Sequence, residues 1–131
     1  MGQQQLLLIV LGVIIVGIAI VVGINLFNAN SISSNRDGVI SDLNNLAALA
    51  HQYYSKPTSM AGGGNSFASY AIPSTLASNA DGAYTIATAG SATGITFQGV
   101  GTQILPGTSN YVTAKIFVRV PPLADSVGVV Y

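Results

Sequence analysis

The chain has 131 residues, of which 50% are hydrophobic and only 6% are charged, with a formal net charge of zero. Its few cations exclude the basic face that nucleic-acid binding needs, and the absence of cysteine excludes disulfides, thiolate metal sites and a cysteine nucleophile. Because a typical domain carries roughly a quarter charged residues, charge this sparse favours a chain that associates over a solitary soluble protein.

An unbroken apolar segment occupies residues 6–24, where every residue is Leu, Ile, Val, Ala or Gly. Its length suits a helix that crosses a membrane. A cleaved secretory signal is disfavoured, because no Lys or Arg occurs before Arg36. A plain membrane anchor is physically adequate, although the flanking cations that usually orient one are missing. The third interpretation is a helix that lies first in a membrane and later in a protein core, where Gly12, Gly17 and Gly23 allow close helix packing.

A second helical pattern follows the polar Asn/Ser stretch after Phe27. Apolar residues recur there at spacings of three and four, which predicts an amphipathic helix whose stripe includes Val39, Leu46 and Tyr53. Pro57 should end the helix near residue 55. The two patterns predict one helix over about residues 1–54, with a hinge at the Asn/Ser stretch as the alternative. Three regions result: a hydrophobic helix half (1–28), an amphipathic helix half (29–56) and a globular head (57–131).

Short β-strand patterns separated by Gly- and Pro-rich turns fill the head. Strands are expected over residues 83–89, 95–100, 111–120 and 127–131, with residues 62–64, all glycine, in a connecting loop. This spacing predicts a small antiparallel sheet whose apolar face covers the amphipathic helix half. The expected fold class is therefore α+β, with a long N-terminal helix packed against a small antiparallel β-sheet head.

The sequence offers little chemistry. His51 is the only histidine and lies in the predicted helix, where a solvated or hydrogen-bonded side chain is the usual outcome. No nucleophile motif, acid–base constellation or metal-ligand spacing accompanies it. Asp81 and Asp125 lie in turn contexts, in which Asp commonly caps backbone amides. We therefore expect a chain that is not an enzyme and uses no cofactor or metal.

Residues 5–18 read QLLLIVLGVIIVGI, and this string resembles the N-terminal region of type IV pilins. In that family a prepilin peptidase removes a short basic leader, and the new first residue is N-methylated. The resemblance implies cleavage just before Met1 and methylation of Met1, so the numbering would be that of the processed chain. Gln5 stands where the family has a Glu that pairs with a neighbour's N-terminal ammonium. An amide can still accept a hydrogen bond there, and a neutral side chain is less costly to bury than a charge.

The resemblance implies a major structural subunit of an extracellular type IV pilus-like filament, inserted in the inner membrane before assembly. Its partners would be identical copies, the prepilin peptidase and the pilus assembly machinery, and surface attachment or motility would belong to the filament. A pseudopilin of a type II secretion-like system, an archaeal-type pilin or adhesion filament subunit, and a monomeric membrane-anchored binding domain are the alternatives. The expected assembly residues are Gln5, Leu6, Leu7, Leu8, Ile9, Val10, Gly12, Ile14, Gly17, Ile18, Gly23 and Phe27.

Overall fold

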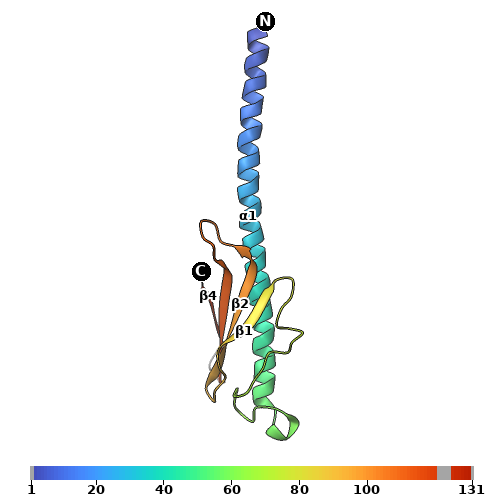
Figure 1. The fold of residues 1–131 in the computed structure, drawn as a ribbon, viewed down its shortest axis with the longest axis vertical. Helices are drawn as coiled ribbons and strands as arrows, with labels where there is room; N and C mark the ends of the chain where they lie inside the picture. Colours follow the sequence, from blue (N-terminus) through green and yellow to red (C-terminus); the bar gives the residue numbers. More distant parts are fainter. Residues whose placement is uncertain (1, 121–124, 131) are drawn as a thin grey trace.

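The computed structural model of the protein describes residues 2–120 and 125–130, and in it one long helix carries a small sheet beside its C-terminal half (Figure 1). Met1 and Tyr131, which belong to the predicted helix and the last predicted strand, lie outside the described residues. The α+β fold predicted from the sequence is confirmed. Its elements are α1 (Gly2–Ser55), the 3₁₀ turn η1 (Thr58–Met60), β1 (Gly82–Thr88), β2 (Gly94–Ile104), β3 (Tyr111–Arg119) and β4 (Ser126–Val130).

Helix α1 continues without interruption through the polar Asn/Ser stretch, so the alternative of a hinge there is wrong. Neither Gly nor Pro occurs between Gly23 and Gly38, and Asn and Ser disfavour an α-helix only slightly. Nothing in this stretch therefore removes a backbone hydrogen bond. The 54 residues of α1 correspond to about 81 Å at 1.5 Å per residue.

The C-terminal end of α1 is closed by the glycine-rich loop that follows it. The backbone N–H of Gly63 donates to the carbonyl of Tyr53 over 2.8 Å, and that of Gly64 donates to the carbonyl of Lys56 over 2.9 Å. A Cβ atom on Gly63 would lie 1.8 Å from the carbonyl oxygen of Ser66. The glycines of the predicted connecting loop thus also donate to carbonyl groups at and just after the helix end, where intrahelical donors run out.

The sheet is an antiparallel meander in the order β1-β2-β3-β4, as the strand pattern predicted. Phe97 on β2 lies opposite Ile86 on β1 and Ile116 on β3, so all three side chains point to one face. Strand β2 extends to Ile104, four residues past its predicted end, and its pairing with β3 shifts between Val100 and Ile104. The shift marks a bulge that bends the end of the strand.

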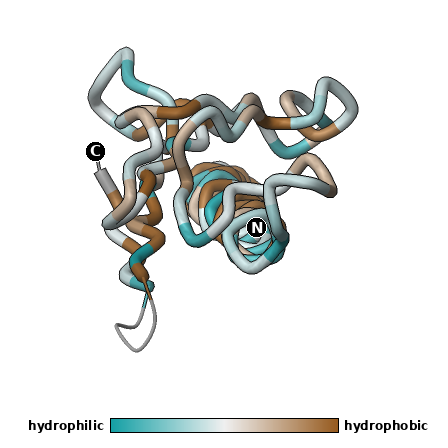
Figure 2. Tube along the Cα trace, turned by 90° about the horizontal axis from the view of Figure 1, so that it is seen from below, coloured by the Kyte–Doolittle hydropathy of each residue, from teal (hydrophilic) through white to brown (hydrophobic). Residues whose placement is uncertain are grey.

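The head packs on one side of the C-terminal half of α1, and the two surfaces form one core (Figure 2). The predicted burial of Val39 and Leu46 on the helix is confirmed, whereas Tyr53 is only half-buried and Phe67, which lies in the chain between the helix and β1, was not predicted. Gly99 permits the close approach, because a Cβ atom there would lie 2.7 Å from the side chain of Val39. The buried cluster consists of Val39, Leu43, Leu46, Ala47, Ala50, Phe67, Tyr84, Ile95, Phe97, Ala114, Ile116 and Val118.

A carboxylate on α1 holds the edge of the sheet. One oxygen of Asp42 accepts hydrogen bonds from the hydroxyl of buried Tyr84 and from the side-chain amide of Asn79, the latter over 2.6 Å. Asn79 also accepts hydrogen bonds from the backbone N–H groups of Asp81 and Gly82, so Asn79 caps this turn. Burial, reinforced by the bond to Asp42, raises the pKa of Tyr84 above the ordinary tyrosine value.

This raised pKa predicts a loss of stability at alkaline pH. Above about pH 10 an unfolded tyrosine ionises while folded Tyr84 stays protonated, so the free energy of unfolding falls as pH rises. We expect Tyr84→Phe to lower stability by about 1–2 kcal/mol at pH 8 and to reduce the further loss between pH 9 and 11. Urea unfolding at each pH measures both effects, with Tyr111→Phe, on an exposed ring, as the control. Equal pH dependence in wild type and Tyr84→Phe would contradict the prediction.

Candidate assembly surface

The N-terminal half of α1 stands clear of the head. Every large apolar side chain between positions 6 and 27 is 50–71% exposed, and the most apolar window of the helix is 0% buried. By length and composition, α1 is long and apolar enough to cross a membrane. Monomeric soluble proteins rarely expose continuous apolar surface on this scale, so this half of the helix requires lipid or protein around it.

The change from exposed to buried occurs within the same helix. Phe27 is 71% exposed, whereas Asn35, two turns further on, is 8% exposed, and the buried stripe continues from there through Val39 and Leu43. The sequence marks this change, because apolar residues occupy all faces of the first half and one face of the second.

Apart from the helix backbone itself, nothing in the described part of the chain packs against the three glycines of the exposed half. A Cβ atom added to Gly12, Gly17 or Gly23 would meet nothing within 4 Å. At about 100° per residue, Gly12 and Gly23 lie on one face of the helix and Gly17 points about 140° away. Small residues therefore occur on two sides of α1, where a bundle with more than one neighbouring helix could approach closely.

The structure places all the predicted assembly residues on this exposed half, and no described residue of the head covers them. They are Gln5, Leu6, Leu7, Leu8, Ile9, Val10, Gly12, Ile14, Gly17, Ile18, Gly23 and Phe27. Met1, the predicted methylation site, lies outside the described residues. The contacts that these residues make in an assembly stay a prediction.

Sequence reasoning missed Asn35, which joins the helix to the head at the point where the helix leaves it. Its amide nitrogen donates to the carbonyl of Asp81 over 2.7 Å, and its amide oxygen accepts from the backbone N–H groups of Thr102 at 3.0 Å and Gln103 at 3.3 Å. A Cβ atom on Gly101 would lie 2.1 Å from that amide oxygen. The bulge at the end of β2 is thus held by a helix side chain. The only signal in the sequence was that polar Asn35 interrupts the apolar spacing between Ile32 and Val39.

His51 makes a structural contact. Its Nε2 lies 2.9 Å from one carboxylate oxygen of Asp125 and 3.1 Å from the other, and Asp125 also accepts the backbone N–H of Arg119. The pair ties α1 to the segment just before β4, as expected for a hydrogen-bonded histidine and a capping aspartate. Across residues 2–120 and 125–130, no three His, Cys, Asp or Glu side chains gather as metal ligands.

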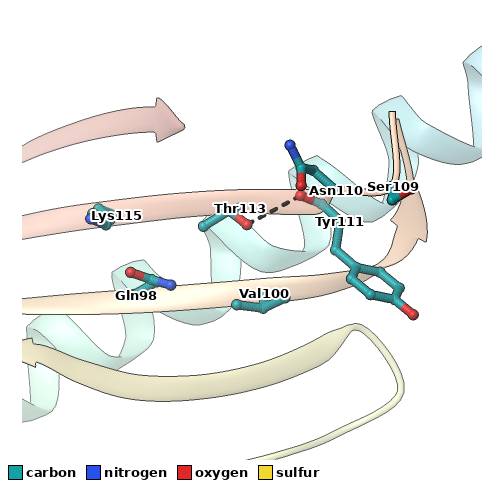
Figure 3. A pocket seen from close by; sticks show the side chains of 7 residues that line it. All are labelled: Gln98, Val100, Ser109, Asn110, Tyr111, Thr113 and Lys115. Atoms are coloured by element: carbon teal, nitrogen blue, oxygen red, sulfur yellow. Dashed lines mark hydrogen bonds between the residues drawn. The ribbon is translucent and has the colours of Figure 1, made fainter. Parts of the chain in front are cut away.

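A shallow hollow lies on the face of the sheet that points away from α1 (Figure 3). Its volume is about 370 Å³, and its walls carry amide, hydroxyl and ammonium groups. The Tyr111 ring extends across the end of β2 at one side of the hollow, and Lys115 lies at the other (Figure 3). The lining residues are Gln98, Val100, Ser109, Asn110, Tyr111, Thr113 and Lys115.

Fold and surface together define a class: a small α+β head on a long helix whose free half is compatible with membrane insertion, a shape also compatible with that of pilins. Comparison with protein-family models finds no match. Comparison with curated proteins finds no similar protein, and comparison with solved structures finds no similar fold.

Proposed function

We propose that this chain is the major structural subunit of an extracellular type IV pilus-like filament, in which copies bundle through the exposed half of α1. The observation that carries the proposal is the contrast within one helix: residues 6–27 are uncovered, while the head has a closed core of its own. The head buries a core of its own, whereas the exposed helix half requires lipid or protein around it. This combination suits a subunit that polymerises through its helix.

The exposed half of α1 does not stay in water. Each copy offers on the order of twenty apolar side chains, and burying a large aliphatic one contributes roughly 1.5–3 kcal/mol relative to water. Association costs about 4–15 kcal/mol in lost translational and rotational freedom, so once a subunit has left the membrane a bundle is strongly favoured over water. Relative to lipid, the preference for a bundle has to come from close packing at the small residues of the helix.

One further feature favours a protein bundle over a permanent lipid anchor. Small residues lie on two sides of the helix, whereas a solitary span needs none. Cleavage before Met1 and its methylation, insertion in the inner membrane and transfer by a pilus assembly machinery belong to the same proposal. A pseudopilin or an archaeal-type filament subunit would use the same helix surface.

Electron microscopy of material sheared from cells tests the proposal. We expect filaments of uniform width that bind an antibody raised against the head, and a mass of the sheared subunit that matches a chain starting at a methylated Met1. If the chain occurs only in the membrane fraction and filaments lack it, it is a membrane-anchored domain and the filament proposal fails.

A further inference from the structure

The hairpin between β2 and β3, residues 104–111, turns toward the N-terminal half of α1 and lies beside the helix (Figure 1). Two of its apolar side chains are exposed to solvent, Ile104 at 50% and Tyr111 at 46%. No charged residue occurs between Asp81 and Lys115, so the hairpin carries no charge. The hairpin itself is therefore uncharged and partly apolar, and the carboxylate at this end of the head, Asp81, lines a separate hollow with Phe27 and Asn35.

The hairpin lies at a definite level along the helix. Ile104 and Pro106 line the same hollow as Asn28 and Ile32 of α1. If residues 6–27 cross a membrane, they span about 33 Å, close to the 30 Å of a hydrocarbon core. Asn28 and Ile32 then lie about 1.5 and 7.5 Å beyond that core, and the headgroup layer is about 5–7 Å deep. The hairpin thus reaches the headgroup layer.

The hairpin is also held in shape. The N–H of Leu105 donates to the carbonyl of Asn110 over 2.9 Å, and the N–H of Thr108 donates to the carbonyl of Leu105 over 3.2 Å. At its base, Asn35 holds the backbone of Thr102 and Gln103. The apolar side chains are therefore presented at a fixed height relative to the helix.

We propose that this hairpin is a second membrane contact of the unassembled subunit, with Ile104 and Tyr111 resting in the lipid headgroup layer. Tyrosine is enriched at that depth, and short apolar segments enter it without spanning the membrane. The contact gives the head a fixed tilt and depth on the membrane. The inference rests on the membrane-inserted stage of the proposed function and not on filament formation.

The absence of tryptophan from the chain permits a direct test. Three variants of the full chain, Ile104→Trp, Phe117→Trp and Phe27→Trp, are each reconstituted in phosphatidylcholine vesicles with bromine near the headgroup end of the acyl chains. Phe117 is the matched control: it is 45% exposed, like Ile104, but lies further along β3, about 20 Å from Tyr111. Phe27→Trp reports on insertion of the helix itself.

We expect bromolipid to quench Ile104→Trp at least about threefold more strongly than Phe117→Trp, because only the hairpin enters the interface. Equal quenching of the two, with Phe27→Trp quenched, would overturn the hairpin contact and leave insertion and the filament proposal standing. Shielding of Ile104→Trp from an aqueous quencher without bromolipid quenching would assign the hairpin to a second copy and also overturn it. Loss of quenching in Phe27→Trp would overturn the inserted state and this inference with it.

Discussion

Leu8→Asp is expected to abolish filaments while the head remains folded. Leu8 is 68% exposed and lies about 40 Å along the helix from Asn35, the first buried residue, so its replacement touches no contact of the head. In a bundle of helices the carboxylate would be buried without a partner in every subunit, at a cost of several kcal/mol per copy. We expect at least a 100-fold loss of sheared filament, since each 1.4 kcal/mol changes an equilibrium tenfold.

Two measurements separate loss of assembly from other causes. Leu8→Ile keeps an apolar side chain of the same size and should give normal filaments. The amount of Leu8→Asp in the membrane fraction should stay near the wild-type level, because Asp costs at most about 2.5–3.5 kcal/mol even at the centre of a span and many aliphatic residues favour insertion. Cells that carry Leu8→Asp and still display normal filaments would show that the assembly surface is elsewhere.

The elements of the fold were predictable because their periodicities are local properties. The helix stripe and the strand alternation follow repeats of 3.6 and 2 residues, and each element was found within a few residues of its predicted bounds. The end of β2 is the exception. Gly101, Thr102 and Gln103 show no alternation, and they join the sheet because Asn35, 67 residues away from Thr102, holds their backbone. A contact across that distance leaves no local pattern.

The candidate assembly surface also has parts that the sequence predicts and parts that depend on distant contacts. The uncovered helix half could be predicted because nineteen consecutive apolar residues leave no polar face. The hairpin beside Asn28 and Ile32 could not, since that proximity depends on how the sheet is placed along the helix. The pairing of His51 with Asp125 spans 74 residues, so the partner could not be predicted from the sequence, although a hydrogen-bonded histidine was expected.

Asn35→Ala is expected to destabilise the head by about 2–3 kcal/mol, the second-largest effect that we predict for a single side chain. The change leaves the carbonyl of Asp81 and the N–H groups of Thr102 and Gln103 without the partner that now satisfies them. Denaturant unfolding of the full chain in mild detergent, followed by the near-ultraviolet signal of the tyrosines, measures the loss. Asn44→Ala, at an exposed position of the same helix, should change stability by less than about 0.5 kcal/mol.

The position of the amide protons that exchange faster shows whether Asn35 acts locally on the bulge of β2 or on the packing of the whole head. If Asn35 acts through the backbone at the end of β2, the amide protons of Thr102 and Gln103 should exchange much faster in Asn35→Ala. The amide protons at the buried centre of β3 should change their exchange rate only by as much as the global stability changes. Because the hairpin follows this bulge directly, its height along the helix should also become less defined. Uniformly faster exchange across all four strands would show instead that Asn35 contributes only to the general stability of the head.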